Sequence, residues 1–392
     1  MMPTDRTAMS ETFETYRGRA RTWLENATIP TLPDDFTERF EIGLAWQKEL
    51  HRSGWVGIHW PREYGGQGLT IEHQLVFTNE LVRARAPQPI GLIGLDVVGP
   101  TVLRYGTEEQ RRRFVPRLLA GDEVWCQGFS EPNAGSDLAS LRTSARADGD
   151  ELVINGQKTW TSWAANADWC AVLARTDAAA QRHKGISYVL VDMRTPGITV
   201  RPIVQLTGDA EFNEVFFDHV RVPKGNVLGP IDGGWSMALD TLAHERAGYA
   251  LRRGIENEVS YLQMLDAIRS DSEQPGNKDE LASDLGMTYV HLRAFRALTQ
   301  RTARRLLADD IPSPYDSVDK LMLGASEQRL FGMALDLLGP SRMAPSSRPH
   351  GLHADQIIKG YLYGRSASVY GGSEQIQRTL IAERLLGLPR SR

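Results

Sequence analysis

The sequence lacks the features of a disulfide-stabilised, metal-binding or membrane-spanning protein. Its 392 residues include two cysteines, Cys126 and Cys170, and two isolated thiols build neither a metal motif nor a disulfide framework. We expect both to be small buried side chains. No run of about 18 apolar residues is present, so no transmembrane helix is predicted. The polar N-terminus has no apolar stretch typical of a secretory signal, and a reducing cytoplasm is the expected compartment.

The sequence also lacks a strong excess of one charge. The formal net charge is -4 and the pI is near 6.2, so no basic field is available to hold a nucleic-acid backbone. A local cluster of Arg could still serve a phosphate-bearing ligand without changing this total. With 41% hydrophobic residues, the chain can bury a sizeable core, and its length suggests two or three domains.

The spacing of apolar residues changes twice along the chain. From Ser10, which is placed to cap the first helix, to about Gly121, the spacing is helical, and a capping box beginning at Thr107 predicts the last helix of this part. Strand-like alternation follows, with a β-hairpin expected to turn at Asn155 and Gly156. Helical spacing then returns, and it predicts long helices over residues 235–268, 278–307, 315–338, 354–370 and 373–386.

This order predicts an α+β chain of three domains. We expect an N-terminal helical domain over residues 1–122, a middle β domain over 123–232 and a C-terminal helical domain over 233–392. A β domain between two helical domains creates two seams. Such seams are where ligand pockets tend to form.

Residues 125–137 combine a strand with a loop rich in Gly, Ser and Asn; they read WCQGFSEPNAGSD. The backbone N–H groups and hydroxyls of such a loop can surround a polar heteroaromatic ring. A strand followed by a turn, with Ser136 or Asp137 capping a short helix, fits the same residues. Taken alone, the segment leaves both interpretations open.

Residues 155–162 place an aromatic side chain directly before two hydroxyls; they read NGQKTWTS. Trp160 can stack on a flat ring while Thr161 and Ser162 hydrogen-bond its edge. A core Trp with two solvated hydroxyls is the alternative.

Residues 370–378 place two glycines before a helix; they read YGGSEQIQR. Gly371 and Gly372 allow a ligand to approach the backbone closely, and the N–H groups of the following helix can face an anion or a carbonyl. The alternative is a simple interhelical turn with Ser373 as N-cap.

Together, these three segments resemble the acyl-CoA dehydrogenase family, and the resemblance covers nearly the whole chain. Further matches are Gly54-Trp55, Trp60-Pro61, Tyr64-Gly65-Gly66, residues 105–110 and residues 215–223. The resemblance implies an N-terminal helical domain, a middle β-barrel-like domain and a C-terminal four-helix bundle, in agreement with the periods described above. It also implies FAD-dependent α,β-dehydrogenation of an acyl thioester, with electrons passed to an electron-transfer flavoprotein or a similar acceptor.

The resemblance implies a role for particular residues. The positions that match FAD contacts in the family are Gln127, Phe129, Ser130, Trp160, Thr161, Ser162, Gly372, Ser373 and Gln375. The positions that match contacts to the thioester substrate are Ser136, Arg246, Tyr370 and Gly371. Glu131, within the FAD loop, is expected to support that loop.

The catalytic base is where the sequence departs from many family members. These members carry a catalytic Glu at the position of Gly371, and glycine has no side chain to serve as a base. Another branch carries the base on the long helix that opens the C-terminal domain, directly before an Arg. Glu245 and Arg246 occupy that place, so we expect Glu245 to be the base. Glu374 is the competing carboxylate, and we expect it to point elsewhere.

Other departures concern assembly and substrate. Residues 271–277 and Asp336 to Pro340 do not match the segments that hold the adenine end of FAD in many members, and Ala243 replaces an acidic residue. Relatives with such losses form dimers or work as one of two unlike subunits, so a homodimer, a homotetramer and a heteromer all remain open. Two other functions also remain open: a subunit without its own base, and an oxygen-using oxidase or monooxygenase. The sequence identifies neither the acyl chain nor its carrier, CoA or carrier protein.

Overall fold

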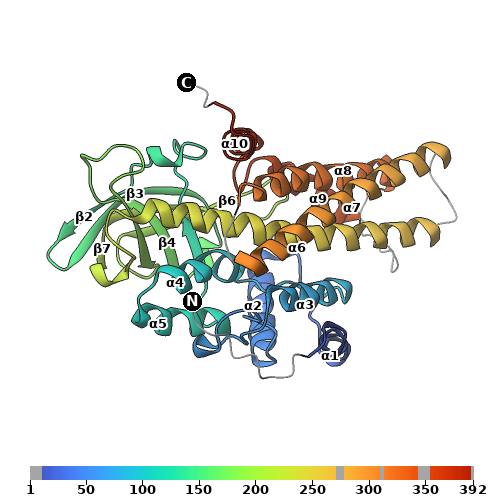
Figure 1. Ribbon diagram of the computed structural model, residues 1–392, viewed down its shortest axis with the longest axis horizontal. Helices are drawn as coiled ribbons and strands as arrows, with labels where there is room; N and C mark the ends of the chain where they lie inside the picture. The colour runs from blue at the N-terminus through green and yellow to red at the C-terminus, as the bar shows by residue number, and fades with distance from the viewer. Residues whose placement is uncertain (1–10, 271–277, 310–312, 343–353, 390–392) are drawn as a thin grey trace.

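The computed structural model describes residues 11–270, 278–309, 313–342 and 354–389. Its elements follow the predicted order of helices, one sheet and helices again (Figure 1). Within the described residues, no helix has the length and apolar character needed to cross a membrane. The same residues contain no cluster of three or more His, Cys, Asp or Glu side chains that could hold a metal ion.

The N-terminal part is helical, and its caps follow from the sequence. Its α-helices are α1 (Phe13–Asn26), α2 (Phe36–Arg52), α3 (Ile71–Arg83), α4 (Gly99–Tyr105) and α5 (Glu108–Ala120), with a π-helical turn η2 (Ile93–Val98) before α4. The capping box at Thr107 and Gln110 is confirmed, and α5 ends at Gly121 in the left-handed conformation. Ser10, the expected first cap, lies outside the described residues. Thr12 caps α1 instead, because its side chain accepts a hydrogen bond from the N–H of Thr15.

The middle part is one mixed sheet, eight-stranded within the described residues. Its strands are β1 (Trp125–Gly128), β2 (Ser144–Asp148), β3 (Glu151–Ser162), β4 (Trp169–Arg175), β5 (Ile186–Asp192), β6 (Ile198–Ile203), β7 (Phe212–Pro223) and β8 (Val227–Leu228). The order is β6-β7-β3-β2-β4-β5-β8, and β1 pairs with β4 in parallel. Cys126 and Cys170 are opposite one another in that pair; both are buried and free, as predicted.

The predicted hairpin at Asn155 and Gly156 is wrong. β3 runs unbroken through both residues, and the reversal lies earlier, between β2 and β3. Asn155 pairs with Ser144 of β2, and the ladder with β7 shifts register between Ile154 and Gly156. Gly156 therefore marks a bulge in a long strand. A Cβ atom on it would lie 2.5 Å from the hydroxyl of Thr143, so the glycine permits a close approach rather than a turn.

The C-terminal part returns to helices, with α6 (Gly234–Ser270) as its longest member. α7 (Lys278–Asp309), α8 (Asp316–Arg342), α9 (Ala354–Gly364) and α10 (Glu374–Leu380) follow. Helix α9 ends six residues before the predicted limit at Tyr370. The hydroxyl of Ser366 donates to the carbonyl of Tyr363 at 2.6 Å, which favours a turn over helix continuation.

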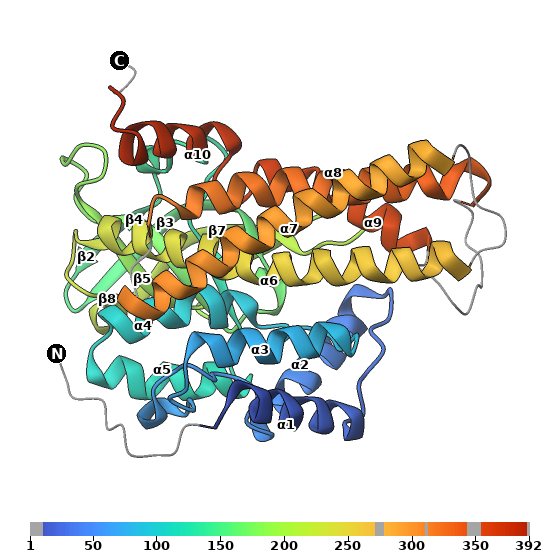
Figure 2. The ribbon, with the colours of Figure 1, turned by 45° about the vertical axis from the view of Figure 1, so that its right-hand side comes forward.

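Helix α6 contacts all three parts of the chain. It crosses the molecule between the N-terminal helices and the C-terminal ones, and its first turns reach the sheet (Figures 1 and 2). Inside this junction, the buried hydroxyls of Thr101 in α4 and Thr241 in α6 lie 2.8 Å apart. Residues on α6 are therefore held against both helical parts and the sheet.

The two faces of the sheet belong to two separate cores. In β4, Trp169, Ala171 and Leu173 belong to the core shared with the N-terminal helices and α6, whereas Cys170 and Val172 belong to a core inside the sheet. The inner core draws on β1 to β5 and on β7, so the sheet folds over it in a barrel-like manner. This alternation fixes which residues of β1 face the helices.

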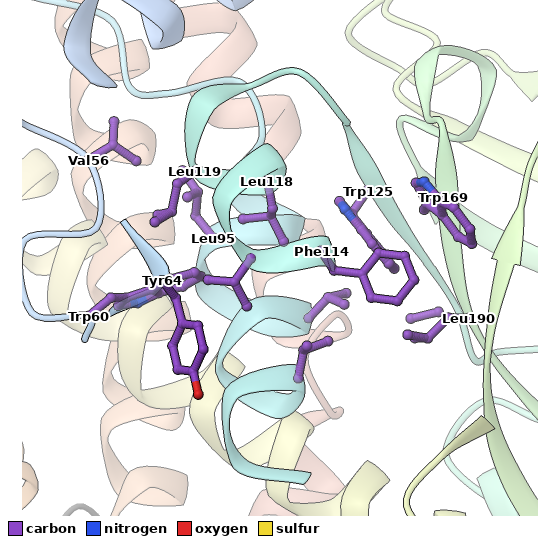
Figure 3. Packing of buried hydrophobic residues seen from close by; sticks show 14 of the residues in the cluster. Val56, Trp60, Tyr64, Leu95, Phe114, Leu118, Leu119, Trp125, Trp169 and Leu190 are labelled. Carbon is purple, nitrogen blue, oxygen red and sulfur yellow. The ribbon is translucent and has the colours of Figure 1, made fainter. Parts of the chain in front are cut away.

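We predict that Phe114→Ala destabilises the protein strongly. Phe114 of α5 is 4% exposed, and its ring centroid lies edge-on to those of Trp125 at 5.3 Å and Trp169 at 4.9 Å. Figure 3 shows Phe114 beside Trp125 and Trp169. The resulting cavity should lower the free energy of unfolding by about 3–5 kcal/mol. Thermal unfolding measures the effect. Phe13→Ala, at a position that is 41% exposed, is the control and should cost less than about 1 kcal/mol.

Candidate active site

The loop after β1 is fixed by a buried ion pair. Nζ of Lys158 donates to Glu131 at 2.9 Å and to the carbonyl of Phe129 at 3.1 Å, and Lys158 is fully buried. Glu131 also accepts the backbone N–H groups of Arg142 and Thr143. Burial opposes ionisation of Glu131, but Lys158 and these N–H groups outweigh it and hold the pKa of the carboxyl below its usual value. Glu131 thus supports the loop, as expected, and Lys158 is a partner that the sequence did not reveal.

The end of β3 presents an aromatic ring beside this loop. The N–H of Thr159 donates to the carbonyl of Ser130 at 3.0 Å, which brings the two sequence segments together. Trp160 is 59% exposed and has a φ of 57°, a left-handed backbone that turns its indole out of the sheet. Oγ1 of Thr161 is buried without a hydrogen-bond partner. An exposed indole beside an unpartnered hydroxyl fits a flat heteroaromatic ring with polar edges.

The double-glycine turn before α10 is held by a buried amide. Gly371 and Gly372 have φ values of 62° and 92°, a backbone that glycine adopts without strain. Nε2 of Gln377 donates to the carbonyl oxygens of Gly371 at 3.2 Å and Gly372 at 3.1 Å. Ser373 is the N-cap of α10, as the alternative interpretation of this segment expected, and Gln375 is exposed on the first turn of that helix.

Glu245 of α6 lies directly opposite this turn. A Cβ atom on Gly371 would be 3.7 Å from Oε1 of Glu245. A carboxylate carried by α6 therefore reaches the place where a side chain of residue 371 would begin. The other carboxylate oxygen of Glu245 is buried without a hydrogen-bond partner, which leaves it free to accept a proton from a ligand.

The surroundings of Glu245 favour its protonated form. Burial raises the pKa of its carboxyl, and the nearby charges of Arg246 and Lys320 and the amide of Gln127 offset this only in part. Gln127 thus belongs to the same site as Glu245 and Gly371. A buried carboxylate whose pKa is raised is a typical general base near neutral pH.

Lys320 of α8 is the principal residue that the sequence did not reveal. It is 4% exposed, its Nζ donates to the carbonyl of Ala367 at 2.6 Å, and the same atom lies 4.0 Å from the centroid of the Tyr370 ring. Burial lowers the pKa of its ammonium to about 8, against the raising effect of Glu245 and other acids. The sequence contains only a weak sign of this role. Lys320 lies three residues before Leu323, so helical spacing places it on the buried face of α8.

The remaining predicted residues divide between this site and its surroundings. Tyr370 belongs to the site, because its hydroxyl donates to that of Tyr249 on α6 at 2.9 Å. Phe129 is buried and packs edge-on against Tyr188, and Ser162 ends β3 beside Phe212. Ser136 is exposed on the loop after β1.

Two further charged residues, Arg246 and Glu374, lie next to the site. Arg246 follows Glu245 on α6, and the charges that act on its guanidinium are those of Glu245, Asp316 and Arg384. Glu374, the competing carboxylate, lies 3.7 Å from Arg378 and packs near Gly324 of α8. Glu374 therefore does not share the position of Glu245 opposite Gly371.

Comparisons with known proteins match this chain over nearly its full length. Models of the N-terminal, middle and C-terminal domains of acyl-CoA dehydrogenases match residues 10–122, 126–220 and 232–386. Acyl-CoA dehydrogenase IpdE1 of Mycobacterium tuberculosis is 41% identical over 388 residues, which cover 96% of this chain and 98% of that protein.

Solved structures also match this chain over nearly its full length. The Tcur3481-Tcur3483 steroid ACAD has a TM-score of 0.85 at 32% identity, over 98% of this chain and 100% of that one. The ChsE4-ChsE5 complex from Mycobacterium tuberculosis has a TM-score of 0.83 at 28% identity, with the same coverage.

Proposed function

The chain belongs to the acyl-CoA dehydrogenase family, and we propose that Glu245 removes the α proton of its acyl thioester substrate. Acyl-CoA dehydrogenases are FAD-dependent flavoproteins, and the chain is an oxidoreductase of this kind. When bound, FAD supplies the acceptor at N5 for the hydride that leaves the β carbon. Removal of the α proton and activation of the thioester carbonyl are assigned to residues of this chain.

One observation carries the assignment of the base. Oε1 of Glu245 lies 3.7 Å from the point where a side chain on Gly371 would begin. Two backbones, α6 and the turn before α10, therefore converge on one place, and only α6 carries a carboxylate there. Its raised pKa and its unpartnered oxygen support the same role.

The α proton must be made acidic before a carboxylate can remove it. A thioester carbonyl becomes activating when fixed donors stabilise the negative charge that develops on its oxygen. The backbone N–H of Gly371 is a candidate donor, because Gln377 holds this turn through its carbonyl groups and leaves that N–H to a ligand. We infer that Tyr370 and Arg246 border the substrate, and that Ser136 approaches it from the loop after β1.

The residues proposed to hold FAD come from three segments. The loop after β1 and the end of β3 are joined through Thr159 and Ser130, and the exposed indole of Trp160 suits the flavin ring. Near the other end of the cofactor, the turn before α10 supplies N–H groups at the start of a helix. The full proposed set is Gln127, Phe129, Ser130, Trp160, Thr161, Ser162, Gly372, Ser373 and Gln375.

The assembly we favour is a heteromer of two unlike dehydrogenase chains. Its electrons would pass to a separate electron-transfer flavoprotein. Two of the similar structures, Tcur3481-Tcur3483 and ChsE4-ChsE5, carry names that combine two different chains. A chain without its own base is the competing function in such an assembly. The presence of Glu245 argues against a chain without a base. It supports the proposal that this chain is the subunit that supplies the base. Flavin absorbance of the purified chain, alone and with a partner chain, distinguishes these arrangements.

We predict that Glu245→Gln retains FAD but loses flavin reduction by an acyl thioester. Removal of a general base should slow the reaction by about 10²–10⁴-fold. Anaerobic stopped-flow absorbance measures the rate. Glu374→Gln removes the competing carboxylate and should retain most of the rate, because Glu374 acts on Lys320 and does not occupy the place opposite Gly371. A normal rate in Glu245→Gln would place the base elsewhere.

We predict that Lys320→Met moves the acid limb of the kcat/KM profile to higher pH. The limb reports the pKa of Glu245, which must be ionised to act as a base. Lys320 lowers that pKa, so loss of the cation should raise it. The comparison is made below the Lys320 pKa of about 8. Lys320→Arg keeps the charge and should leave the limb in place, whereas an unmoved limb in Lys320→Met would contradict the electrostatic coupling.

We predict that Trp160→Ala weakens FAD binding by about 0.5–1.5 kcal/mol, the usual value of an aromatic stacking contact. Equilibrium dialysis of the apoprotein measures affinity, and the flavin absorbance spectrum reports the environment of the ring. Trp160→Phe keeps an aromatic face and should retain most of the affinity. Unchanged affinity and spectrum in Trp160→Ala would remove the indole from the FAD site.

A further inference from the structure

The segment before the double-glycine turn is fastened to α8 by one side chain. Nζ of Lys320 donates to the carbonyl oxygen of Ala367 at 2.6 Å and lies 4.0 Å from the centroid of the Tyr370 ring. The stem of Lys320 also borders the turn, because a Cβ atom on Gly371 would lie 3.3 Å from Cε of the lysine. Lys320 therefore contacts this segment on both the carbonyl of Ala367 and the ring that directly precedes Gly371.

Tyr370 is held at further points, which makes it the residue that sets the turn. Its hydroxyl donates to that of Tyr249 on α6 at 2.9 Å, and its backbone N–H donates to the carbonyl oxygen of Ser366 at 3.0 Å. The peptide group that follows Tyr370 carries the N–H of Gly371, the candidate donor to the thioester carbonyl. The direction of this N–H therefore depends on how firmly Tyr370 is held.

The hold of Lys320 on these partners depends on its proton. A charged donor makes a stronger hydrogen bond than a neutral one, and the face of an aromatic ring attracts a cation. Burial lowers the pKa of Lys320 to about 8. The charged groups that act on it come from α6, α8 and α10: Glu245, Glu327 and Glu374 raise this pKa, and Arg246 lowers it. The ammonium form predominates below about pH 8 and is lost as the pH rises through that value.

We propose that the ammonium form of Lys320 positions the N–H of Gly371 for the thioester carbonyl, by holding Tyr370 and the carbonyl of Ala367 against α8. Lys320 is then a positioning residue, which acts through the turn rather than on the substrate. The proposal rests on the proposed function for the place of the thioester. It deepens that function by giving the site a second titrating group, which limits activity at alkaline pH as Glu245 limits it at acid pH.

The first test follows α-proton exchange of 3,3-dimethylbutanoyl-CoA in D₂O, by mass spectrometry, across neutral and alkaline pH. Exchange without protein is subtracted at each pH. With the wild-type protein, the exchange rate should fall about tenfold as the pH rises through about 8, because the charge-assisted hydrogen bond and the attraction to the ring are lost together. An exchange rate that does not fall in this range overturns the proposal.

Two variants at residue 320 separate charge from packing. Lys320→Arg keeps its charge at alkaline pH, so the fall in rate should disappear. Lys320→Met resembles the neutral amine in size, so its rate should be about tenfold below wild type at neutral pH and should show no further alkaline fall. A lysine that only fills the core would give no fall that follows its charge. An alkaline fall that persists in Lys320→Arg overturns the proposal.

A matched pair at residue 370 tests the ring that faces the ammonium. Tyr370→Phe keeps the aromatic face and should retain the alkaline fall, whereas Tyr370→Leu removes that face and should reduce it. Each variant is compared with itself at neutral and at alkaline pH, so a change in its overall rate does not affect the result. Equal falls in the two variants would contradict the proposal.

A measurement that needs no proton transfer separates this proposal from the assignment of the base. The Glu245→Gln protein binds 3,3-dimethylbutanoyl-CoA labelled with ¹³C at the carbonyl, and the ¹³C NMR shift reports hydrogen bonding to that carbonyl. We expect the resonance to be displaced from that of the free thioester at neutral pH and to return toward it at alkaline pH. The midpoint should lie below that of the exchange profile, because the charge of Glu245 raises the pKa of Lys320.

The outcomes of the two measurements are distinct. Absence of exchange by the wild-type protein at every pH counts against Glu245 as the base, and the NMR titration then decides the role of Lys320. In the Glu245→Gln background, Lys320→Arg should keep the resonance displaced at alkaline pH. A resonance that is not displaced, or a displacement that does not change with pH in the presence of Lys320, overturns the proposal.

Discussion

The structure depends on a carboxylate held out of water beside an ammonium group. Glu245 is enclosed at the junction of α6, α8 and the double-glycine turn, and Lys320 shares this enclosure. Burial raises the pKa of the carboxyl, and the charges of Arg246 and Lys320 offset part of that rise. Gly371 leaves the space between the two residues open, since a Cβ atom there would lie 3.7 Å from Oε1 of Glu245 and 3.3 Å from Cε of Lys320.

The fold supplies this enclosure by sharing one helix among its three parts. α6 packs against the N-terminal helices, the sheet and the C-terminal helices, so its residues are surrounded on several sides. Glu245 on this helix lies near Lys320, and residues next to Glu245, among them His244 and Gly248, line a cavity together with His59 and Asp96. The sheet contributes Gln127 to the first of these, from a strand whose loop is fixed by Glu131 and Lys158. Helix α6 therefore connects Glu245 to all three parts of the chain.

Much of this could be predicted from the sequence, because local signals agreed with the final structure. The capping box at Thr107 and the helix–sheet–helix order depend on near neighbours in the chain, and both predictions are confirmed. The hairpin at Gly156 failed because pairing with β2 and β7 outweighed a strong local turn signal. Lys320 and Gln377 escaped prediction because their roles arise only when α8 and α10 meet the glycine turn, and nothing in the local sequence marks that meeting.

The most direct measurement of the central claim is proton exchange at the α carbon, separated from hydride transfer. 3,3-Dimethylbutanoyl-CoA has α hydrogens but none on the β carbon, so it can lose a proton without being oxidised. Incubated in D₂O with the FAD-loaded protein and followed by mass spectrometry, it should gain deuterium at the α carbon with wild type and not with Glu245→Gln. Equal exchange by the two proteins would contradict the account, because some other group would then be removing the proton.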